Sequence, residues 1–137
     1  MGTRRQAREL ALQALFFLDI DKLDPEENLD AFCINYEEQL TKNIKPFFMV
    51  LVRGVLENKA EIDTLIRKYS KNWKLSRMPA VDRNIMRIAT FELLKLEDVP
   101  ATVSINEAIE IAKDFSSDDS GAFVNGILES VKGEVRS

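Results

Sequence analysis

The residues from Val81 to Leu96 (VDRNIMRIATFELLKL) constrain the fold more than any other stretch of the sequence. At 3.6 residues per turn, the apolar side chains of this predicted helix cover one broad arc; they are Val81, Ile85, Met86, Ile88, Ala89, Leu93 and Leu96. Phe91 and Leu94 add apolar surface to the more polar side. A helix this apolar needs neighbours on several sides, so we expect the rest of the chain to pack around it.

One charged residue, Glu92, falls within the apolar arc of this central helix. Burying an unpaired carboxylate is costly. The sequence therefore predicts that the fold brings Glu92 a cation, a helix N-terminus or a hydrogen-bond donor. A structurally paired glutamate is the favoured interpretation, and a catalytic glutamate is the alternative.

Length and composition limit the classes of protein to which the chain can belong. The 137 residues fit one domain of ordinary size, over residues 1–137. The only cysteine, Cys33, cannot form an internal disulfide, which indicates a reducing cytoplasm. No apolar run approaches the ~20 residues of a membrane span, and the polar amino terminus lacks a signal-peptide core, so we expect a cytoplasmic protein without a membrane partner. The net charge of −4 means that any nucleic-acid binding must come from a local basic cluster.

Such a cluster lies at the amino terminus, where apolar spacing predicts a helix over residues 3–18. Arg4, Arg5 and Arg8 fan out from one edge of its apolar stripe, and Phe16 continues the same flank. Guanidinium groups pair with phosphates, and an aromatic ring offers a stacking platform for an unpaired base. The combination predicts binding of single-stranded RNA. The alternative is an ordinary solvated face, with Phe16 covered by another segment.

The middle of the chain also has helical patterns. Asp24 is a predicted N-cap for a helix that runs to about Leu40, with a buried face of Leu29, Phe32, Cys33, Tyr36 and Leu40. Residues 44–71 contain two more helices with a break near Asn58. Within the first of them, Gly54 marks either a close helix crossing or a kink. Trp73 is predicted to anchor the following connector in the core.

Two helices complete the chain after Pro100. The segment Ser104-Ile-Asn-Glu107 has the pattern of a capping box, which predicts a helix start at that point. Residues 116–121 (SSDDSG) predict a loop. The last helix turns inward a face made of Val124, Ile127, Leu128, Val131 and Val135. Phe123 lies at the boundary of this face, and Gly126 permits close contact with another helix.

No segment has the pattern of a strand. The sequence predicts an all-α fold of about seven helices in two packed bundles, with helices 1–3 over about residues 3–58 and helices 4–7 over about residues 59–136.

Residue patterns for catalysis are lacking. The chain has no histidine, no second cysteine for a metal site, and no glycine-rich phosphate loop. Its adjacent acidic pairs suit solvated faces rather than acid–base chemistry; they are Glu26/Glu27, Glu37/Glu38 and Asp118/Asp119. We expect no catalytic residues, no metal and no cofactor.

Four segments of the sequence resemble the NusB family of bacterial transcription antitermination factors. They are RRxARExAxQALF at residues 4–16, VDRNIMRIAxFEL at 81–93, VP at 99–100 with INEAxExAK at 105–113, and FVNGIL at 123–128. Together they span nearly the whole chain and are highly specific, whereas the arginine-rich start alone would be a weak signal. The resemblance implies an all-helical fold of two bundles set at an angle.

The same resemblance implies a function. Members of the family bind the single-stranded boxA element of nascent RNA together with NusE, a small-subunit ribosomal protein. The chain would then help to hold this RNA on elongating RNA polymerase, in an antitermination complex that suppresses termination chiefly in ribosomal RNA operons. Some relatives form a homodimer through the arginine-bearing helix and others are monomers, so both states stay open.

The resemblance also implies site residues. The candidate RNA-binding residues are Arg4, Arg5, Arg8, Phe16, Phe123 and Asp119. Relatives often have tyrosine where this chain has Phe16, so the hydroxyl is lost and the stacking face is kept. Asp82, at the start of the central helix, matches an acidic contact for NusE.

Two other functions remain open from the sequence. One is a stand-alone relative of the RNA-binding module of ribosomal RNA cytosine methyltransferases, although neither a cofactor-binding α/β domain nor a catalytic cysteine is recognisable here. The other is a helical adaptor that binds only protein, in which case the arginines would be incidental.

Overall fold

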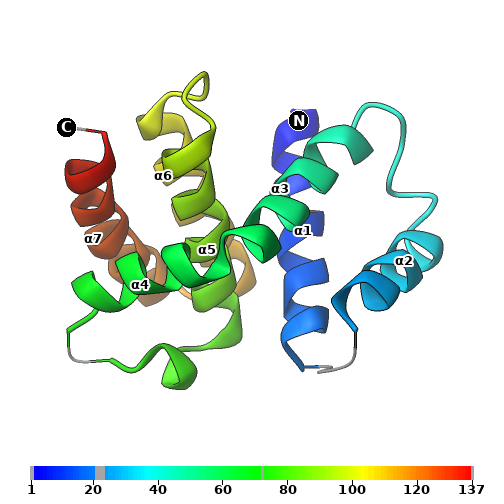
Figure 1. The fold of residues 1–137 in the computed structure, drawn as a ribbon. Helices are drawn as coiled ribbons and strands as arrows, with labels where there is room; N and C mark the ends of the chain where they lie inside the picture. Colours follow the sequence, from blue (N-terminus) through cyan, green and yellow to red (C-terminus); the bar gives the residue numbers. More distant parts are fainter. Residues whose placement is uncertain (1, 21–23, 72, 137) are drawn as a thin grey trace.

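Seven α-helices and one short 3-10 helix make up the computed structural model, which describes residues 2–20, 24–71 and 73–136 (Figure 1). The helices are α1 (Thr3–Ile20), α2 (Pro25–Asn35), α3 (Lys45–Glu57), α4 (Lys59–Tyr69), η1 (Leu75–Arg77), α5 (Ala80–Lys95), α6 (Ala101–Phe115) and α7 (Asp118–Val135). None of the described residues lies in a strand. The prediction of an all-α fold with seven helices is confirmed.

The predicted central helix, α5, contacts five other α-helices: α1, α3, α4, α6 and α7. Every side chain from Asn84 to Leu93 is buried. Each fully buried large apolar side chain contributes about 1.5–3 kcal/mol to folding, so α5 contributes substantially to core stability. Its expected position among neighbours on several sides is confirmed.

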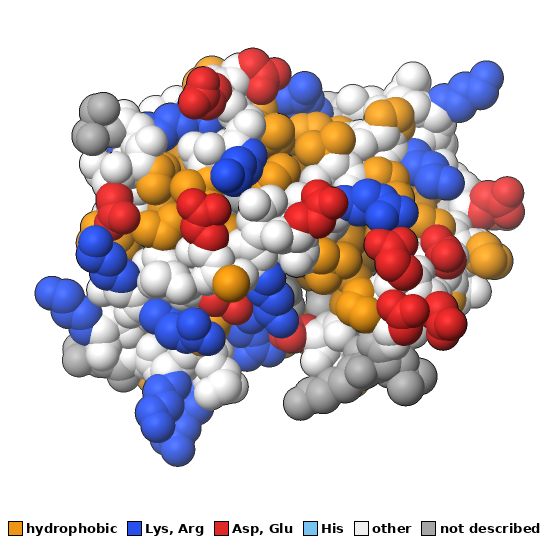
Figure 2. Space-filling model, viewed as in Figure 1, with side chains coloured by type: hydrophobic (Ala, Val, Ile, Leu, Met, Phe, Trp, Pro, Cys, Tyr) orange, Lys and Arg blue, Asp and Glu red, His pale blue; other side chains and the backbone are white. Residues whose placement is uncertain are grey.

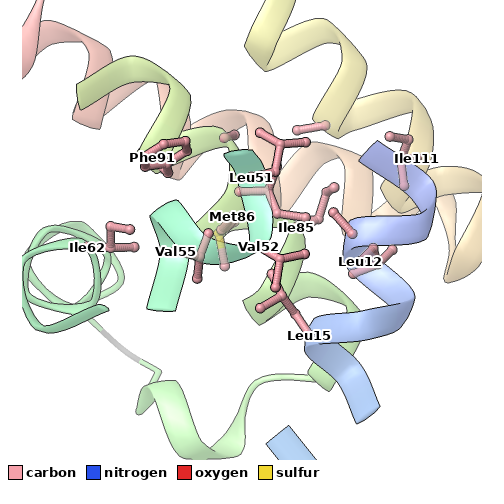
Figure 3. Close-up of a cluster of buried hydrophobic side chains, with 14 of the residues drawn as sticks. Leu12, Leu15, Leu51, Val52, Val55, Ile62, Ile85, Met86, Phe91 and Ile111 are labelled. Carbon is pink, nitrogen blue, oxygen red and sulfur yellow. The ribbon is translucent and has the colours of Figure 1, made fainter. Parts of the chain in front are cut away.

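The other helices form two groups that meet along α5 (Figure 1). In the first group, α1 packs against α2 and α3; in the second, α4, α6 and α7 surround α5. Figure 3 shows side chains from both groups in one continuous cluster, with Leu15 of α1, Ile85 of α5 and Ile62 of α4 among those labelled. The predicted break between two helices near Asn58 is confirmed, because Asn58 separates α3 from α4.

Gly54 of α3 packs directly against the Phe91 ring of α5. A Cβ atom built on Gly54 would lie 2.1 Å from Cζ of Phe91, so only glycine fits there. Of the two interpretations, the close helix crossing is correct. Gly126 is different, because a Cβ atom there would meet nothing within 4 Å. The prediction that Gly126 permits a close helix contact is wrong.

The predicted starts of the last two helices are wrong. α6 begins at Ala101, directly after Pro100, because proline is well tolerated at the start of a helix. Ser104 therefore lies inside α6, where its hydroxyl donates to a carboxylate of α5 instead of capping. α7 begins at Asp118, since Ser117 is its N-cap and accepts from the Ser120 amide at 3.2 Å.

Helix α2 ends at Asn35, earlier than the predicted limit near Leu40. The chain continues in turns, and the Leu40 amide donates to the Tyr36 carbonyl at 2.9 Å. Leu29, Phe32 and Leu40 are buried as predicted, while Cys33 and Tyr36 are half-buried. The buried face is therefore kept although the helix stops short.

Arg136 fastens the end of the chain to the core. Its guanidinium donates four hydrogen bonds of 2.8–3.0 Å to carbonyls at and after the end of α5; the acceptors are Glu92, Leu93, Leu96 and Val99. The last carbonyls of a helix have no partners within the helix, so this arginine acts as a side-chain cap.

Trp73 does not anchor the connector between α4 and α5, as was predicted. Its side chain is 57% exposed, while Leu75 and Met78 are buried and fasten the connector instead. The Trp73 ring stands edge-on to Phe123 of α7, with ring centroids 6.3 Å apart and an interplanar angle of 75°.

Candidate functional site

The three amino-terminal arginines of α1 have three different environments. Arg4 is exposed, and its guanidinium carbon lies 4.4 Å from the centroid of the Phe47 ring of α3. Stacking on an aromatic ring holds a guanidinium in place and leaves its N–H groups free to donate. Arg4 is therefore the arginine best placed to meet a phosphate from solvent.

Arg5 is held by Glu107 of α6. Its Nε and Nη2 atoms each donate to a carboxylate oxygen of Glu107 at 2.6 Å, and each side chain is 22% exposed. These hydrogen bonds lower the pKa of Glu107 and raise the pKa of Arg5 further above its usual value. A phosphate that approaches Arg5 has to compete with this carboxylate.

Arg8 is buried, so it does not fan out beside Arg4 and Arg5 as the sequence predicts, and its role as an RNA contact stays a prediction. Its side chain is 4% exposed and forms a bidentate pair with Glu92, at 2.9 and 2.7 Å. Ser104 donates to the same carboxylate at 2.8 Å. Glu92 thus has both a cation and a hydroxyl donor, which confirms the expectation that it is paired. Arg8 is buried because its positive charge compensates the negative charge of Glu92, which is buried in α5.

The aromatic ring next to the arginines comes from Phe47, which the sequence reasoning missed. Phe47 belongs to α3 and directly precedes the buried Phe48. Because neighbouring residues of a helix point in different directions, this adjacency was the one sign in the sequence that the Phe47 ring is not directed into the core. Phe16 lies further along α1, is 38% exposed and borders an apolar groove. Whether Phe16 stacks on RNA stays a prediction.

The groove beside Phe16 has a volume of about 1060 Å³. It lies between the second half of α1, α2, the start of α5 and the end of α6. Its lining includes large apolar side chains that are 38–65% exposed; they are Phe16, Phe17, Ile20 and Phe115. A patch of exposed aromatic and aliphatic groups at this density is typical of a protein-binding surface.

Asp82 was predicted to be an acidic contact for a partner, but it is 3% exposed and presents little charge at the surface. Its Oδ2 atom accepts from the Ser120 hydroxyl at 3.1 Å. Burial raises the pKa of Asp82, and the Ser120 hydrogen bond opposes this rise. Oδ1 is buried and has no hydrogen-bond partner among the described residues. Asp82 therefore belongs to the junction between α5 and α7 and not to an exposed acidic face.

Asp119 and Phe123 lie near this junction, at the start of α7. Asp119 is exposed and Phe123 is half-buried. Both line a small pocket of about 240 Å³ together with Trp73 and Asp82. Their roles as RNA contacts stay predictions.

The described residues contain no group of three or more histidine, cysteine, aspartate or glutamate side chains that could hold a metal ion. Among the helices of residues 2–20, 24–71 and 73–136, none has the length and apolar character needed to cross a membrane.

Comparison with known proteins gives consistent results. The NusB family model matches residues 5–132. The transcription antitermination protein NusB of Desulforapulum autotrophicum is 58% identical over 132 residues, which cover 96% of this chain and 92% of that protein. The solved structure of T. maritima NusB has a TM-score of 0.87 and 40% identity, and the match covers 98% of this chain and 93% of that one.

A third match is a crystal structure of the antitermination factors NusB and NusE in complex with double-stranded RNA, with a TM-score of 0.86 and 98% coverage of both chains. The sequences are 24% identical, so this match shows a shared fold alone. Because the family model spans nearly the whole chain and a relative is 58% identical, the chain belongs to the NusB family.

Proposed function

We propose that this chain is a transcription antitermination factor that binds single-stranded boxA RNA together with NusE. In this function it helps to hold the RNA on elongating RNA polymerase and suppresses termination, chiefly in ribosomal RNA operons. It acts in the cytoplasm, and it works by binding rather than by catalysis. The names of its relatives support this proposal.

The observation that carries the proposal is the division of α1 into two different surfaces. One end presents Arg4 on the Phe47 ring and Arg5 in its pair with Glu107, and the other end presents Phe16 and Phe17 to the apolar groove. Cations beside an aromatic ring suit a phosphodiester chain, whereas exposed apolar rings suit a protein. One helix can thus hold an RNA and a protein at the same time.

On the RNA side, Arg4 supplies the exposed guanidinium and Arg5 a half-buried one. The net charge of the whole chain is −4, so these few cations work against a repulsive background. We therefore expect the chain alone to bind RNA weakly and to gain affinity from a partner that adds its own cations.

On the protein side, we assign NusE to the apolar groove between α1, α2, α5 and α6. The groove has the size and the exposed aromatic anchors that a protein interface needs. A second copy of the chain is the competing occupant, which would correspond to the homodimer seen in some relatives.

A titration of fluorescent boxA RNA with and without saturating NusE tests the proposal. NusE should raise the RNA affinity, and RNA must raise the NusE affinity by the same factor. Phe17→Asp should abolish this coupling without weakening the binding of RNA to the chain alone, because a charge in the groove blocks docking. Lys59→Asp, on the exposed start of α4, is the control.

Three results would count against the proposal. If the chain binds no RNA with or without NusE, it is a protein-binding adaptor. If NusE leaves the RNA affinity unchanged, the coupling is absent. If Phe17→Asp abolishes self-association in sedimentation and leaves NusE binding intact, the groove belongs to the homodimer.

A further inference from the structure

Glu107 of α6 occupies the hydrogen-bond donors of Arg5 at the edge of the arginine cluster. The two side chains are joined by two hydrogen bonds of 2.6 Å, and each is 22% exposed. A carboxylate offers two oxygens to the planar guanidinium fork, which is the same bidentate arrangement that a phosphate offers. Glu107 therefore holds the atoms of Arg5 that a phosphate of RNA would need.

Two further carboxylates act on Arg5 through their charge. The hydrogen bonds to Glu107 are the largest cause of the raised pKa of Arg5, and the charges of Glu9 and Asp114 add to it. On the face of the molecule drawn in Figure 2, acidic and basic side chains are likewise interspersed. Arg5 is thus a compensated cation, and its charge is not freely available to a polyanion.

Arg8 provides a second partner for Glu107. Its Nε and Nη2 atoms donate to Glu92, and its Nη1 atom lies 3.5 Å from Oε1 of Glu107. Arg8 and Glu92 are almost fully buried, so this guanidinium stays in place when the surface rearranges. When Arg5 turns to a phosphate, Glu107 is left beside another cation, which avoids the cost of an unpaired, partly buried charge.

We propose that Glu107 is a competing ligand of Arg5 that lowers the RNA affinity of the chain, and that RNA binds by displacing this carboxylate with a phosphate. In the bound state Arg5 donates to the phosphate, and Glu107 pairs with Nη1 of Arg8. The inference rests on the proposed RNA-binding function. It assigns an inhibitory role to an acidic residue for which the sequence predicts only helix capping.

The geometry favours competition over the alternative, in which Glu107 merely orients Arg5 for RNA. Nε and Nη2 form the edge of a guanidinium that binds two oxygens at once, and both donate to Glu107. Arg4 shows the contrasting arrangement, because its guanidinium carbon lies 4.4 Å from the centroid of the Phe47 ring. An aromatic ring orients a guanidinium through its flat face and leaves the N–H groups free, whereas a carboxylate occupies them.

The first test is Glu107→Gln, which keeps the shape of the side chain and removes its charge. It should tighten the binding of fluorescent boxA RNA about 3- to 10-fold at low salt, and the gain should shrink as the salt concentration rises. Asp114→Asn is the matched control, because it removes a charge that also acts on Arg5 and leaves the hydrogen bonds to Glu107 intact. It should change the affinity by less than about twofold. Circular dichroism checks that both variants are folded.

The second test is a double-mutant cycle with Arg5→Gln. In a competition, Arg5→Gln weakens RNA binding more in the Glu107→Gln background than in the wild type, because Arg5 no longer has to leave a carboxylate. If Glu107 orients Arg5 for RNA, the loss is greater in the wild type. If Glu107 acts only as a nearby negative charge, the two losses are equal. Either of the last two results overturns the inference.

A third measurement needs no variant, so it decides the matter even if Glu107→Gln does not fold. Carbon-detected NMR follows the pKa of the Glu107 carboxyl group in the free protein and in the RNA complex. The hydrogen bonds from Arg5 are the largest cause of its lowered pKa, while the charge of Arg8 also lowers it. The pKa should therefore rise when RNA takes Arg5 away. An unchanged pKa in the complex would show that Arg5 stays on Glu107.

The outcomes separate this inference from the proposed function. RNA that binds the wild type but binds Glu107→Gln no more tightly would overturn the inference and leave the function standing. An equal gain in Asp114→Asn would do the same, because it would reduce the effect to general charge. RNA that binds neither the wild type nor the variants, with or without NusE, would overturn both.

Discussion

Arg8 of α1 and Glu92 of α5 form a buried bidentate ion pair, with N–O distances of 2.9 and 2.7 Å, at the point where the two helices meet. Nη1 of Arg8 also lies 3.5 Å from the carboxylate of Glu107, which in turn holds Arg5. Glu92, Arg8, Glu107 and Arg5 therefore form a chain of alternating charges that runs from the core to the surface near α1. The exposed basic end of α1 is positioned by charges that reach into the centre of the fold.

This arrangement predicts that Arg8→Ala and Glu92→Gln each lower the free energy of unfolding by about 3–5 kcal/mol, because each leaves a buried charge without its partner. Urea unfolding followed by circular dichroism measures the effect. Lys68→Ala, which removes one partner of the exposed pair with Glu134, is the control and should change the free energy of unfolding far less than either buried variant. A loss below 1 kcal/mol in both buried variants would show that the pair is not a structural requirement.

Gly54→Ala should destabilise the protein by about 1–3 kcal/mol, because the new methyl group would overlap the Phe91 ring and push α3 away from α5. Gly126→Ala is the matched control, since it also lies inside a helix but has open space around it. It should stabilise by about 0.5–1 kcal/mol through helix propensity. Equal effects of the two substitutions in thermal unfolding would contradict the close crossing.

The Arg5–Glu107 pair should contribute stability that depends on pH. Arg5 lowers the pKa of Glu107 in the folded chain, so the contribution is complete above the unfolded pKa of about 4.3 and is lost as the pH falls through the lower folded value. The melting temperature of the wild type should exceed that of Glu107→Gln at pH 6, and the difference should shrink below about pH 4. A difference that grows on acidification would contradict this sign.

Arg4→Ala should weaken RNA binding and lower stability only by the loss of its stack on the Phe47 ring, because Arg4 is exposed and forms no ion pair among the described residues. The slope of log K against log[salt] should fall by about 0.7, the value for one phosphate contact on a single strand. Lys42→Ala, on the exposed turn before α3, is the control for a general charge effect. Identical slopes for wild type and Arg4→Ala would remove this residue from the RNA site.

Much of the fold follows from local patterns that the sequence carries by itself. The apolar period of residues 81–96 predicts both the helix and its central position, because an apolar stripe of that breadth has to be covered on several sides. The need of Glu92 for a partner follows in the same way from the cost of burying a charge. The family membership rests on segments that are also visible without a structure.

Only the tertiary structure decided which side chains contact one another. Arg8 has the sequence context of a surface arginine, yet it is buried because α1 crosses α5 next to Glu92. Ser104 matches a capping pattern, but its hydroxyl donates a hydrogen bond to the carboxylate of Glu92. Trp73 is exposed because Leu75 and Met78 already fill the core beneath the connector. Periodicity shows which side of a helix turns inward, since that depends on neighbouring residues in the chain. It does not show which residues meet there, because those contacts join positions up to 102 residues apart and depend on how the helices pack.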